Sequence, residues 1–449
     1  MASVYEVFWR QELESMWNTE LLETWDDKIC SLSRDQNLDW FPITYEICDY
    51  FSMIGHMTYH GMPTHYGHWS YGKTFERTRT MYNMGMEGLP YELIINSNPS
   101  IAYLMRENPA YLQVLIMAHC VGHSDFFKNN RMFKDTRPES VVARFRAAKK
   151  RIMSYIEDPT IGVEEVEPVL DAAHALQFQV YRYGQKVRKH KDLVKKYTEL
   201  IKNDEDGEYY DFDINKKPLE PDYDILGFVS ENSHGIPEWK RDVIEIVRDS
   251  AAYFRPQIQT KIMNEGWASY WHYTTLHNLE LQSEWHIPFV KTHNQVIRPH
   301  IGGLNPYHVG FVVFQDIIEK YGIEEAFIAR ETLHDVAFLR QYLTRDLCED
   351  LGLFSFSEKR KDGITIDDIS DEDGWKIVKY DLLKNVGTNS IPIIFVEEIE
   401  SDGTLILRHE HDGRDLDLEH AEKVVEHAKT LWGSHVKLFT DLEDELWEI

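Results

Sequence analysis

The chain has 449 residues, of which 43% are hydrophobic and 13% aromatic, and its formal net charge is −28. This length predicts two or three domains with a large core, and the acidic charge disfavours general binding to nucleic-acid backbones. No signal-peptide pattern begins the sequence, and no apolar run approaches the roughly 20 residues that cross a bilayer, so we expect a cytoplasmic protein without a membrane span. The four cysteines are scattered without CxxC spacing, which indicates reduced thiols.

The first half of the chain has an aromatic, Gly- and Pro-punctuated start, followed by helices. Residues 59–69 are expected to form an ordered loop. The Asn108-Pro109 pair is typical of a helix start, with Asn as the N-cap, and this helix should end near Phe127. Further helices are expected after Pro138 and over 168–201.

Two polar stretches are expected to separate the later elements. Residues 203–223 are acidic and contain proline, which favours a long loop or linker. A helical pattern follows from Ile225 to Leu279 with breaks, and another helix is expected after Pro306. The charged residues 357–374 suggest a second linker.

The C-terminal part changes character to short β-rich runs around one helix. Strands are predicted at 391–396, 405–407 and 436–439, with a helix over 416–432 between the last two. A DG dipeptide between the first two strands favours a hairpin turn. This order is that of a small ββαβ module.

Together the predicted elements define an α+β protein of two domains. The larger domain is expected to be mainly helical and to span residues 1–355, including the acidic linker near 203–223. The smaller α/β domain is expected to span 375–449.

The first predicted helix carries two histidines with metal-ligand spacing. His119 and His123 lie four residues apart, so they share one face of the helix, together with Leu112, Leu115 and Ile116. Two imidazoles on one buried helical face can bind the same ion, which is the spacing of zinc-binding helices. The alternative is that both are ordinary core histidines.

A second helical segment places a carboxylate on its inner stripe. Glu265 follows Ile258 and Ile262 at helical spacing, and His272 lies two turns further along the same stripe. A buried carboxylate is costly unless it is paired or bound to a metal, although a buried hydrogen bond or an exposed position would also explain Glu265. Gly266 indicates a close approach of another helix.

Two histidines on one helix and a glutamate on another form the ligand set of a class of zinc peptidases. We therefore predict a zincin-like helix pair with His119, His123 and Glu265 as ligands, and His272 as a fourth ligand or a transition-state donor. However, Cys120 stands where the general-base glutamate of HExxH would be, so the usual water-activating carboxylate is missing. Asp125 is a candidate substitute.

These two helix motifs resemble those of the SpoVR (stage V sporulation protein R) family. The resemblance is carried by 119–130 and 260–272, and further by short motifs at 61–63, 68–69, 305–307, 310–311, 342–344, 416–418 and 431–433. The resemblance implies a link to spore cortex formation in spore formers and to peptidoglycan processing. The family is also expected to lack the HExxH glutamate, so that Cys120 is not peculiar to this chain.

Other histidines cluster in the sequence and are candidates for the lining of the same pocket. His65 and His68 lie in the predicted ordered loop, and His308 follows Tyr307 at the start of a predicted helix. Chance clustering and local packing would explain the same pattern.

The sequence is compatible with three functional hypotheses. The first is a metal-dependent hydrolase that binds zinc, or iron, and cleaves a peptide or a cell-wall-derived substrate. The second is a non-catalytic regulator or scaffold, with a structural metal or a buried polar cluster and unidentified protein partners. The third is a non-haem iron site, since two histidines and one carboxylate also suit that metal.

Overall fold

The structure is a computed structural model, and it describes residues 17–84, 92–182, 193, 220–233, 235–300, 303–359, 363–442 and 445–449. The chain forms two compact units, each built from two separate stretches of sequence. Unit 1 comprises Met1–Ala147 and Pro256–Asn389, and unit 2 comprises Ala148–Arg255 and Ser390–Ile449. The α+β fold class is confirmed, whereas the proposed domain limits at 355 and 375 stay a prediction.

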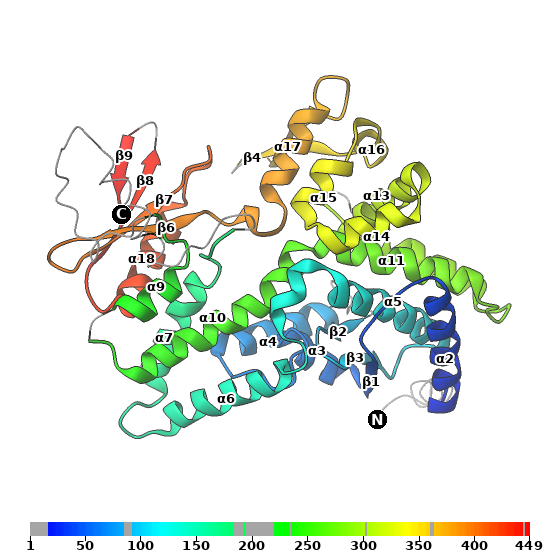
Figure 1. The fold of residues 1–449 in the computed structure, drawn as a ribbon, viewed down its shortest axis with the longest axis horizontal. Coiled ribbons are helices and arrows are strands. Elements are labelled where there is room, and N and C mark those ends of the chain that lie inside the picture. Colours follow the sequence, from blue (N-terminus) through cyan, green and yellow to red (C-terminus); the bar gives the residue numbers. More distant parts are fainter. Residues whose placement is uncertain are drawn as a thin grey trace. The chain divides into compact units, whose positions relative to one another are not determined.

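Three helices that lie side by side form the centre of unit 1 (Figure 1). They are α5 (Ala110–Asn129), α11 (Lys261–Asn278) and α13 (Pro306–Tyr321). Nearly every residue of α5 is buried, so it has no polar face. Because Gly266 of α11 lies against the backbone of Gly310 on α13, a Cβ atom on Gly266 would come within 2.2 Å of the Gly310 carbonyl carbon. The close helix approach predicted at Gly266 is confirmed.

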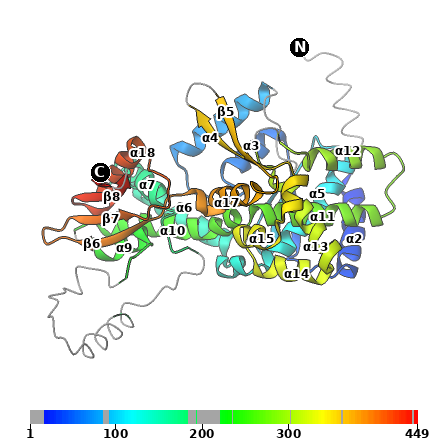
Figure 2. The ribbon, with the colours of Figure 1, turned by 90° about the horizontal axis from the view of Figure 1, so that it is seen from above.

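The other described helices of unit 1 pack on this centre or on its neighbours (Figure 2). They are α2 (Thr19–Asp35), α3 (Tyr50–Thr58), α4 (Trp69–Asn83), η1 (Arg131–Thr136), α12 (His286–Val296), α14 (Ile323–Thr332), α15 (Asp335–Tyr342), α16 (Arg345–Asp350) and α17 (Trp375–Asn385). Three further helical segments run across the limits of the units: α6 (Val141–Glu157), α10 (Glu238–Gln259) and η2 (Gly387–Ser390).

Unit 1 also contains two small sheets. In the first, β1 (Ile43–Cys48) pairs in parallel with β3 (Ser100–Met105), which also pairs antiparallel with β2 (Leu93–Ile95). In the second, β4 (Phe354–Lys359) and β5 (Gly363–Ile369) form an antiparallel pair. The linker predicted at 357–374 is therefore wrong over most of its length. Its charged composition concealed a period-two alternation, which begins at Phe354 and favours strands.

Two predicted helix limits also need correction. Helix α5 begins at Ala110 rather than at Pro109, because Pro109 is still extended, with ψ of 159°, and no side chain caps the helix. The helix predicted from 168 starts earlier and ends sooner, since α7 runs over Val163–Leu176. The rest of that predicted helix from residue 183 lies outside the described residues, apart from Leu193, as does the linker up to residue 219.

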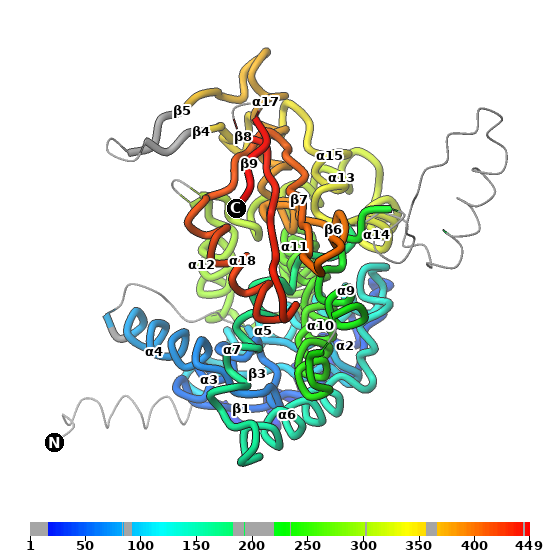
Figure 3. The backbone as a smooth tube through the Cα atoms, turned by 90° about the vertical axis from the view of Figure 1, so that its left-hand side faces the viewer, coloured from blue at the N-terminus to red at the C-terminus, as the bar shows by residue number. Residues whose placement is uncertain are grey.

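Unit 2 contains the predicted ββαβ module, with one additional strand (Figure 3). Strands β6 (Ile394–Ile399) and β7 (Leu405–His409) form a hairpin, and β8 (Val436–Leu442) pairs in parallel with β7 after helix α18 (Leu418–Trp432). The additional strand β9 (Glu445–Glu448) completes the order β6-β7-β8-β9. Helix α18 packs on α7, and Trp432 stacks on Phe228 of α9 (Ile225–Asn232), so the module forms part of a larger unit.

Within the part of the chain that the structure describes, no helix is both long and apolar enough to span a bilayer.

Candidate metal centre

Helix α5 directs two imidazoles toward the same point beside α11. His119 and His123 lie one turn apart, with their ring centroids 4.5 Å apart, and they are 1% and 4% exposed. Their spacing follows from the 3.6-residue repeat of the helix, which places residues i and i+4 on one face. His119 and His123 therefore lie on one face of the helix, as their spacing in the sequence predicts.

Glu265 on α11 approaches both of these imidazoles. Its Oε2 atom lies 3.4 Å from Nε2 of His123 and 3.7 Å from Nε2 of His119. Burial opposes ionisation of this carboxyl, but the two histidines outweigh burial and hold the pKa of Glu265 well below its usual range. The Glu265 carboxylate is therefore negatively charged in a largely buried position.

A second carboxylate, Glu92, joins this group from the residue before β2. Its Oε1 atom lies 3.8 Å from Nε2 of His119 and accepts a hydrogen bond of 2.8 Å from the Tyr307 hydroxyl. Sequence reasoning missed Glu92, because a single glutamate before a three-residue strand has no spacing relation to the histidine helix. Only the tertiary structure, which brings Glu92 next to His119, could reveal it.

Together, two histidines and two glutamates form a group that could hold a metal ion. One ligand atom from each of Glu92, His119, His123 and Glu265 lies within 4.8 Å of the others. Ligand atoms about 2.0–2.2 Å from a tetrahedral zinc ion are roughly 3.3 Å from each other. Three distances between a histidine nitrogen and a glutamate oxygen in the group, 3.4 to 3.8 Å, are close to that value.

The hydrogen bonding of the group supports the same conclusion. Nε2 of His119 and Oε2 of Glu265 are buried and have no hydrogen-bond partner. Unpartnered buried polar atoms are rare, because each costs about 1–3 kcal/mol in lost solvation. A cation between these atoms would satisfy both, and the donor set of imidazole nitrogen and carboxylate oxygen suits zinc, iron or manganese.

The opposite nitrogens of the two imidazoles are also hydrogen-bonded. Nδ1 of His123 lies 2.9 Å from Oδ1 of Asn264, and Nδ1 of His119 lies 2.8 Å from Nδ1 of His272. Burial alone would lower the pKa of His123, but Glu265 and then Asn264 raise it above its ordinary value. Such partners orient metal-binding histidines, since they fix which nitrogen carries the hydrogen.

His272 lies behind His119 rather than within the group of four. Its two ring nitrogens lie 2.8 Å from Nδ1 of His119 and 2.8 Å from Nδ1 of His293. Burial, and then the neighbouring histidines, lower the pKa of His272 well below its ordinary value, and burial lowers that of His293 to about 4. The structure therefore places His272 in contact with a candidate ligand and not with the carboxylates.

Asp125 belongs to a different network, one turn beyond the histidines. Its Oδ2 accepts a hydrogen bond of 2.8 Å from Trp267 Nε1, and its Oδ1 accepts one of 2.8 Å from the backbone of Asp39. The Arg330 Nε atom lies 3.6 Å away. Because the Trp267 side chain and the Asp39 backbone already donate hydrogen bonds to the two carboxylate oxygens, the geometry gives no support to Asp125 as a water-activating base. Cys120, at the HExxH glutamate position, is also outside the group of four.

Of the four further pocket candidates, the structure brings Tyr307 alone to the centre. Its ring stacks on that of His119 at 6.2 Å, and burial raises the pKa of its hydroxyl well above the ordinary value. His65 instead contacts the carbonyl oxygen of Tyr66 and the ring of Phe145, and His68 is the N-cap of α4. His308 occupies the first turn of α13 and is not part of the group.

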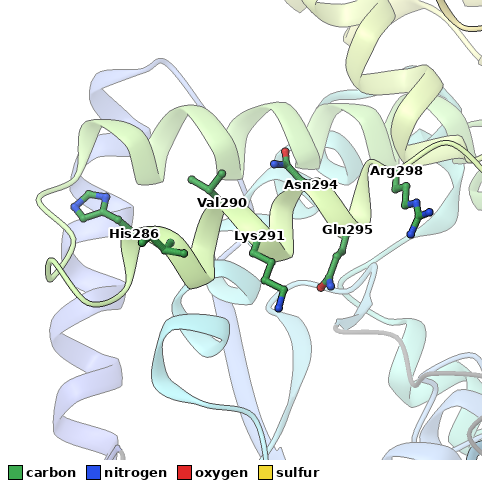
Figure 4. Close-up of a pocket in the computed structure, with 7 residues that line it drawn as sticks. His286, Val290, Lys291, Asn294, Gln295 and Arg298 are labelled. Atoms are coloured by element: carbon green, nitrogen blue, oxygen red, sulfur yellow. The ribbon is translucent and has the colours of Figure 1, made fainter.

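A shallow surface pocket lies elsewhere, along the outer side of α12 (Figure 4). Its lining comprises His286, Ile287, Val290, Lys291, Asn294, Gln295 and Arg298. None of these residues belongs to the group of four.

The fold and the site define an α+β protein with a buried centre of two histidines and two carboxylates. A family model described as SpoVR-like protein matches residues 16–391, and one described as SpoVR-like C-terminal domain matches residues 392–443. The chain belongs to the SpoVR-like family. It is 31% identical over 481 aligned positions to the uncharacterized protein YcgB of Escherichia coli (strain K12), covering 95% of this chain and 93% of that protein. No solved structure is significantly similar to the chain.

Proposed function

We propose that this protein is a cytoplasmic metal-dependent hydrolase that cleaves an amide bond. His119, His123 and Glu265 hold a divalent ion, zinc or iron, which supplies Lewis acidity and lowers the pKa of a bound water. The observation that carries the proposal is the pair of buried atoms without hydrogen-bond partners, His119 Nε2 and Glu265 Oε2, which lie 3.7 Å apart.

In this proposal Glu92 takes the part of the missing HExxH glutamate. Tyr307 orients its carboxylate through the 2.8 Å hydrogen bond to Oε1, so that Glu92 can accept a proton from water at the centre. The side chains of Glu92 and Glu265 are 11% and 16% exposed. The side chains of His119 and His123 are only 2% and 5% exposed. This difference favours access for a substrate from the carboxylate side.

The substrate class rests on the family rather than on the site. The link of the family to cell-wall processing suggests short peptides derived from peptidoglycan. Their amide bonds are of the type that a water-activating metal centre hydrolyses.

A structural metal in a non-catalytic regulator or scaffold is the second candidate. It is favoured by the proximity of all four donors within 4.8 Å, because four protein ligands complete a tetrahedral shell and leave no position for water. The two candidates differ in the part played by Glu92, which is a base in the first and a ligand in the second.

The test begins with the metal content of the purified protein, measured by elemental mass spectrometry. About one zinc or iron per chain is expected, and the His119→Ala, His123→Ala double variant should lose it. His420→Ala, which changes an exposed histidine of α18, is the control. A folded wild-type protein that contains no metal and takes none up from added Zn²⁺ or Fe²⁺ would refute the centre.

Glu92→Gln then separates the enzyme from the scaffold. If Glu92 is the base, the variant keeps its metal and loses at least about 100-fold in the hydrolysis of peptidoglycan-derived peptides. Loss of the metal from this variant, with no hydrolysis by the metal-loaded wild type, would favour the structural site instead.

A further inference from the structure

Three buried imidazoles form a continuous chain that starts at the candidate metal centre. Nδ1 of His119 lies 2.8 Å from Nδ1 of His272, and Nε2 of His272 lies 2.8 Å from Nδ1 of His293. The three residues are 1%, 0% and 2% exposed, and they come from α5, α11 and α12. Each of the two ring nitrogens of His272 therefore has another histidine as its hydrogen-bond partner.

The chemistry of imidazole fixes which ring donates and which accepts in each of these two hydrogen bonds. Each hydrogen bond needs one hydrogen, and a neutral imidazole carries one hydrogen on one of its two nitrogens. A cation at Nε2 of His119 requires the hydrogen of that ring to be on Nδ1, which then donates to Nδ1 of His272. The hydrogen of His272 must consequently be on Nε2, which donates to Nδ1 of His293.

The surroundings of the chain favour neutral rings in fixed orientations. The ring of His293 is packed among Tyr273, Phe311 and Phe289, at centroid distances of 4.6, 5.3 and 6.3 Å. Aromatic packing restricts rotation of the ring, and burial disfavours a charged imidazole. The far end of the chain is therefore held in position by the core.

The two candidate histidine ligands differ in what lies behind them. Nδ1 of His123 faces the side-chain oxygen of Asn264 at 2.9 Å, an acceptor that fixes its ring directly. His119 has no such single acceptor, because His272 accepts a hydrogen only when its own hydrogen is on the other nitrogen. His119 therefore depends on two further residues for its tautomer.

We infer that His272 and His293 are positioning residues, which hold His119 as the tautomer with hydrogen on Nδ1 and a free Nε2 lone pair directed at the carboxylates. The inference rests on the proposed metal centre and deepens it, because it identifies two residues, on α11 and α12, that set the affinity of a ligand on α5. Partners of this kind raise the basicity of a metal-binding imidazole and fix its orientation.

The first experiment compares Zn²⁺ affinity among variants of the full chain. His272→Leu removes the acceptor for His119 and is expected to weaken Zn²⁺ binding about 10- to 100-fold. His272→Gln supplies an amide oxygen in place of the ring nitrogen and should restore most of that loss. His277→Gln is the matched control, because His277 contacts Tyr273 beside the chain without belonging to it. Equal affinity in all four proteins would overturn the inference and leave the metal centre intact.

The second experiment reads the tautomers directly, by ¹⁵N NMR of the histidine side chains in the wild-type protein. With Zn²⁺ bound, the hydrogen is expected on Nδ1 of His119 and on Nε2 of His272. A hydrogen on Nδ1 of His272 in the zinc-loaded protein would overturn the inference, whether or not the leucine variant folds. Failure of the wild type to bind Zn²⁺ at all would instead refute the metal centre, and the inference with it.

Discussion

Two carboxylates on the same pair of helices, one fully and one largely buried, have opposite surroundings. Asp125 of α5 is fully buried and accepts hydrogen bonds from Trp267 and from the backbone of Asp39, with Arg330 nearby. Glu265 of α11 faces two imidazoles at 3.4 and 3.7 Å, and its Oε2 has no hydrogen-bond partner. The partners of Asp125 can only donate hydrogens or carry positive charge, whereas those of Glu265 can share a cation with it.

The difference shows how burial alone fails to identify a functional carboxylate. Burial raises the pKa of Asp125 to about 6, while the histidines lower that of Glu265 despite its burial. The groups that surround each carboxylate therefore decide its role: Asp125 links helices, and Glu265 is a candidate ligand. Three substitutions test that contrast, from the largest expected effect to the smallest, and a pH titration of a third carboxylate extends it.

Asp125→Ala should produce the largest loss of stability. It would leave the Arg330 guanidinium buried without its carboxylate and the Trp267 N–H without an acceptor, at a cost of about 3–5 kcal/mol in the free energy of unfolding. Urea unfolding followed by circular dichroism would measure this. Asp39→Ala is the control, since its exposed side chain pairs with Lys128 at the surface and should matter by less than about 1 kcal/mol. A loss below about 1 kcal/mol for Asp125→Ala would contradict the structural role.

Gly266→Ala tests the packing that holds Glu265 in place. A Cβ atom here would meet the Gly310 backbone at 2.2 Å, which forces α11 and α13 apart and should cost about 1–3 kcal/mol. Gly55→Ala is the matched control, because that helical glycine of α3 has open space around it and alanine favours helix by up to about 1 kcal/mol. Thermal unfolding of both variants provides the comparison, and equal stability would argue against the close approach.

Glu265→Gln should act on metal binding more than on folding. Glutamine keeps the shape of the side chain and removes its charge, so metal affinity should fall about tenfold or more, equivalent to about 1.4 kcal/mol. Titration with Zn²⁺, with Glu319→Gln on the exposed side of α13 as control, measures the change. Unchanged metal affinity would show that Glu265 is not a ligand, and its role would then not differ from that of Asp125.

A third carboxylate, Asp335, is tested through the pH dependence of stability. It accepts hydrogen bonds from the backbone N–H groups of Ile262 and Met263 at the start of α11, and burial raises its pKa to about 7. Because this folded-state pKa lies above the unfolded value, its contribution to stability is fully present below about pH 4 and is lost as pH rises to 7. The slope is at most about 1.4 kcal/mol per pH unit.

The measurement is urea unfolding between pH 4 and 8, with Asp335→Asn as the comparison. The difference in the free energy of unfolding between the two proteins at each pH reports on the Asp335 carboxyl alone, since the other titrating groups are common to both proteins. A difference that does not change with pH in this window would show that Asp335 titrates normally.

Local spacing was sufficient to predict much of the molecule. The helices that carry His119, His123 and Glu265, the close approach at Gly266 and the order of strands around α18 all follow from repeats of 3.6 or two residues and from turn residues. These patterns are local, because the geometry of a helix or strand relates residues only a few positions apart. The hairpin of β4 and β5 was missed because its charged composition hid the alternation.

Tertiary structure decided which of these residues meet. Glu92 joins the centre from before β2, and His293 joins the imidazole chain from α12, although neither has a spacing relation to His119. Likewise, the sequence offered Asp125 as a substitute for the missing base, and only the packing of Trp267 and Arg330 against Asp125 shows that its oxygens are engaged elsewhere. Contacts between distant segments depend on how complete helices and strands pack, and no repeat within one segment encodes them.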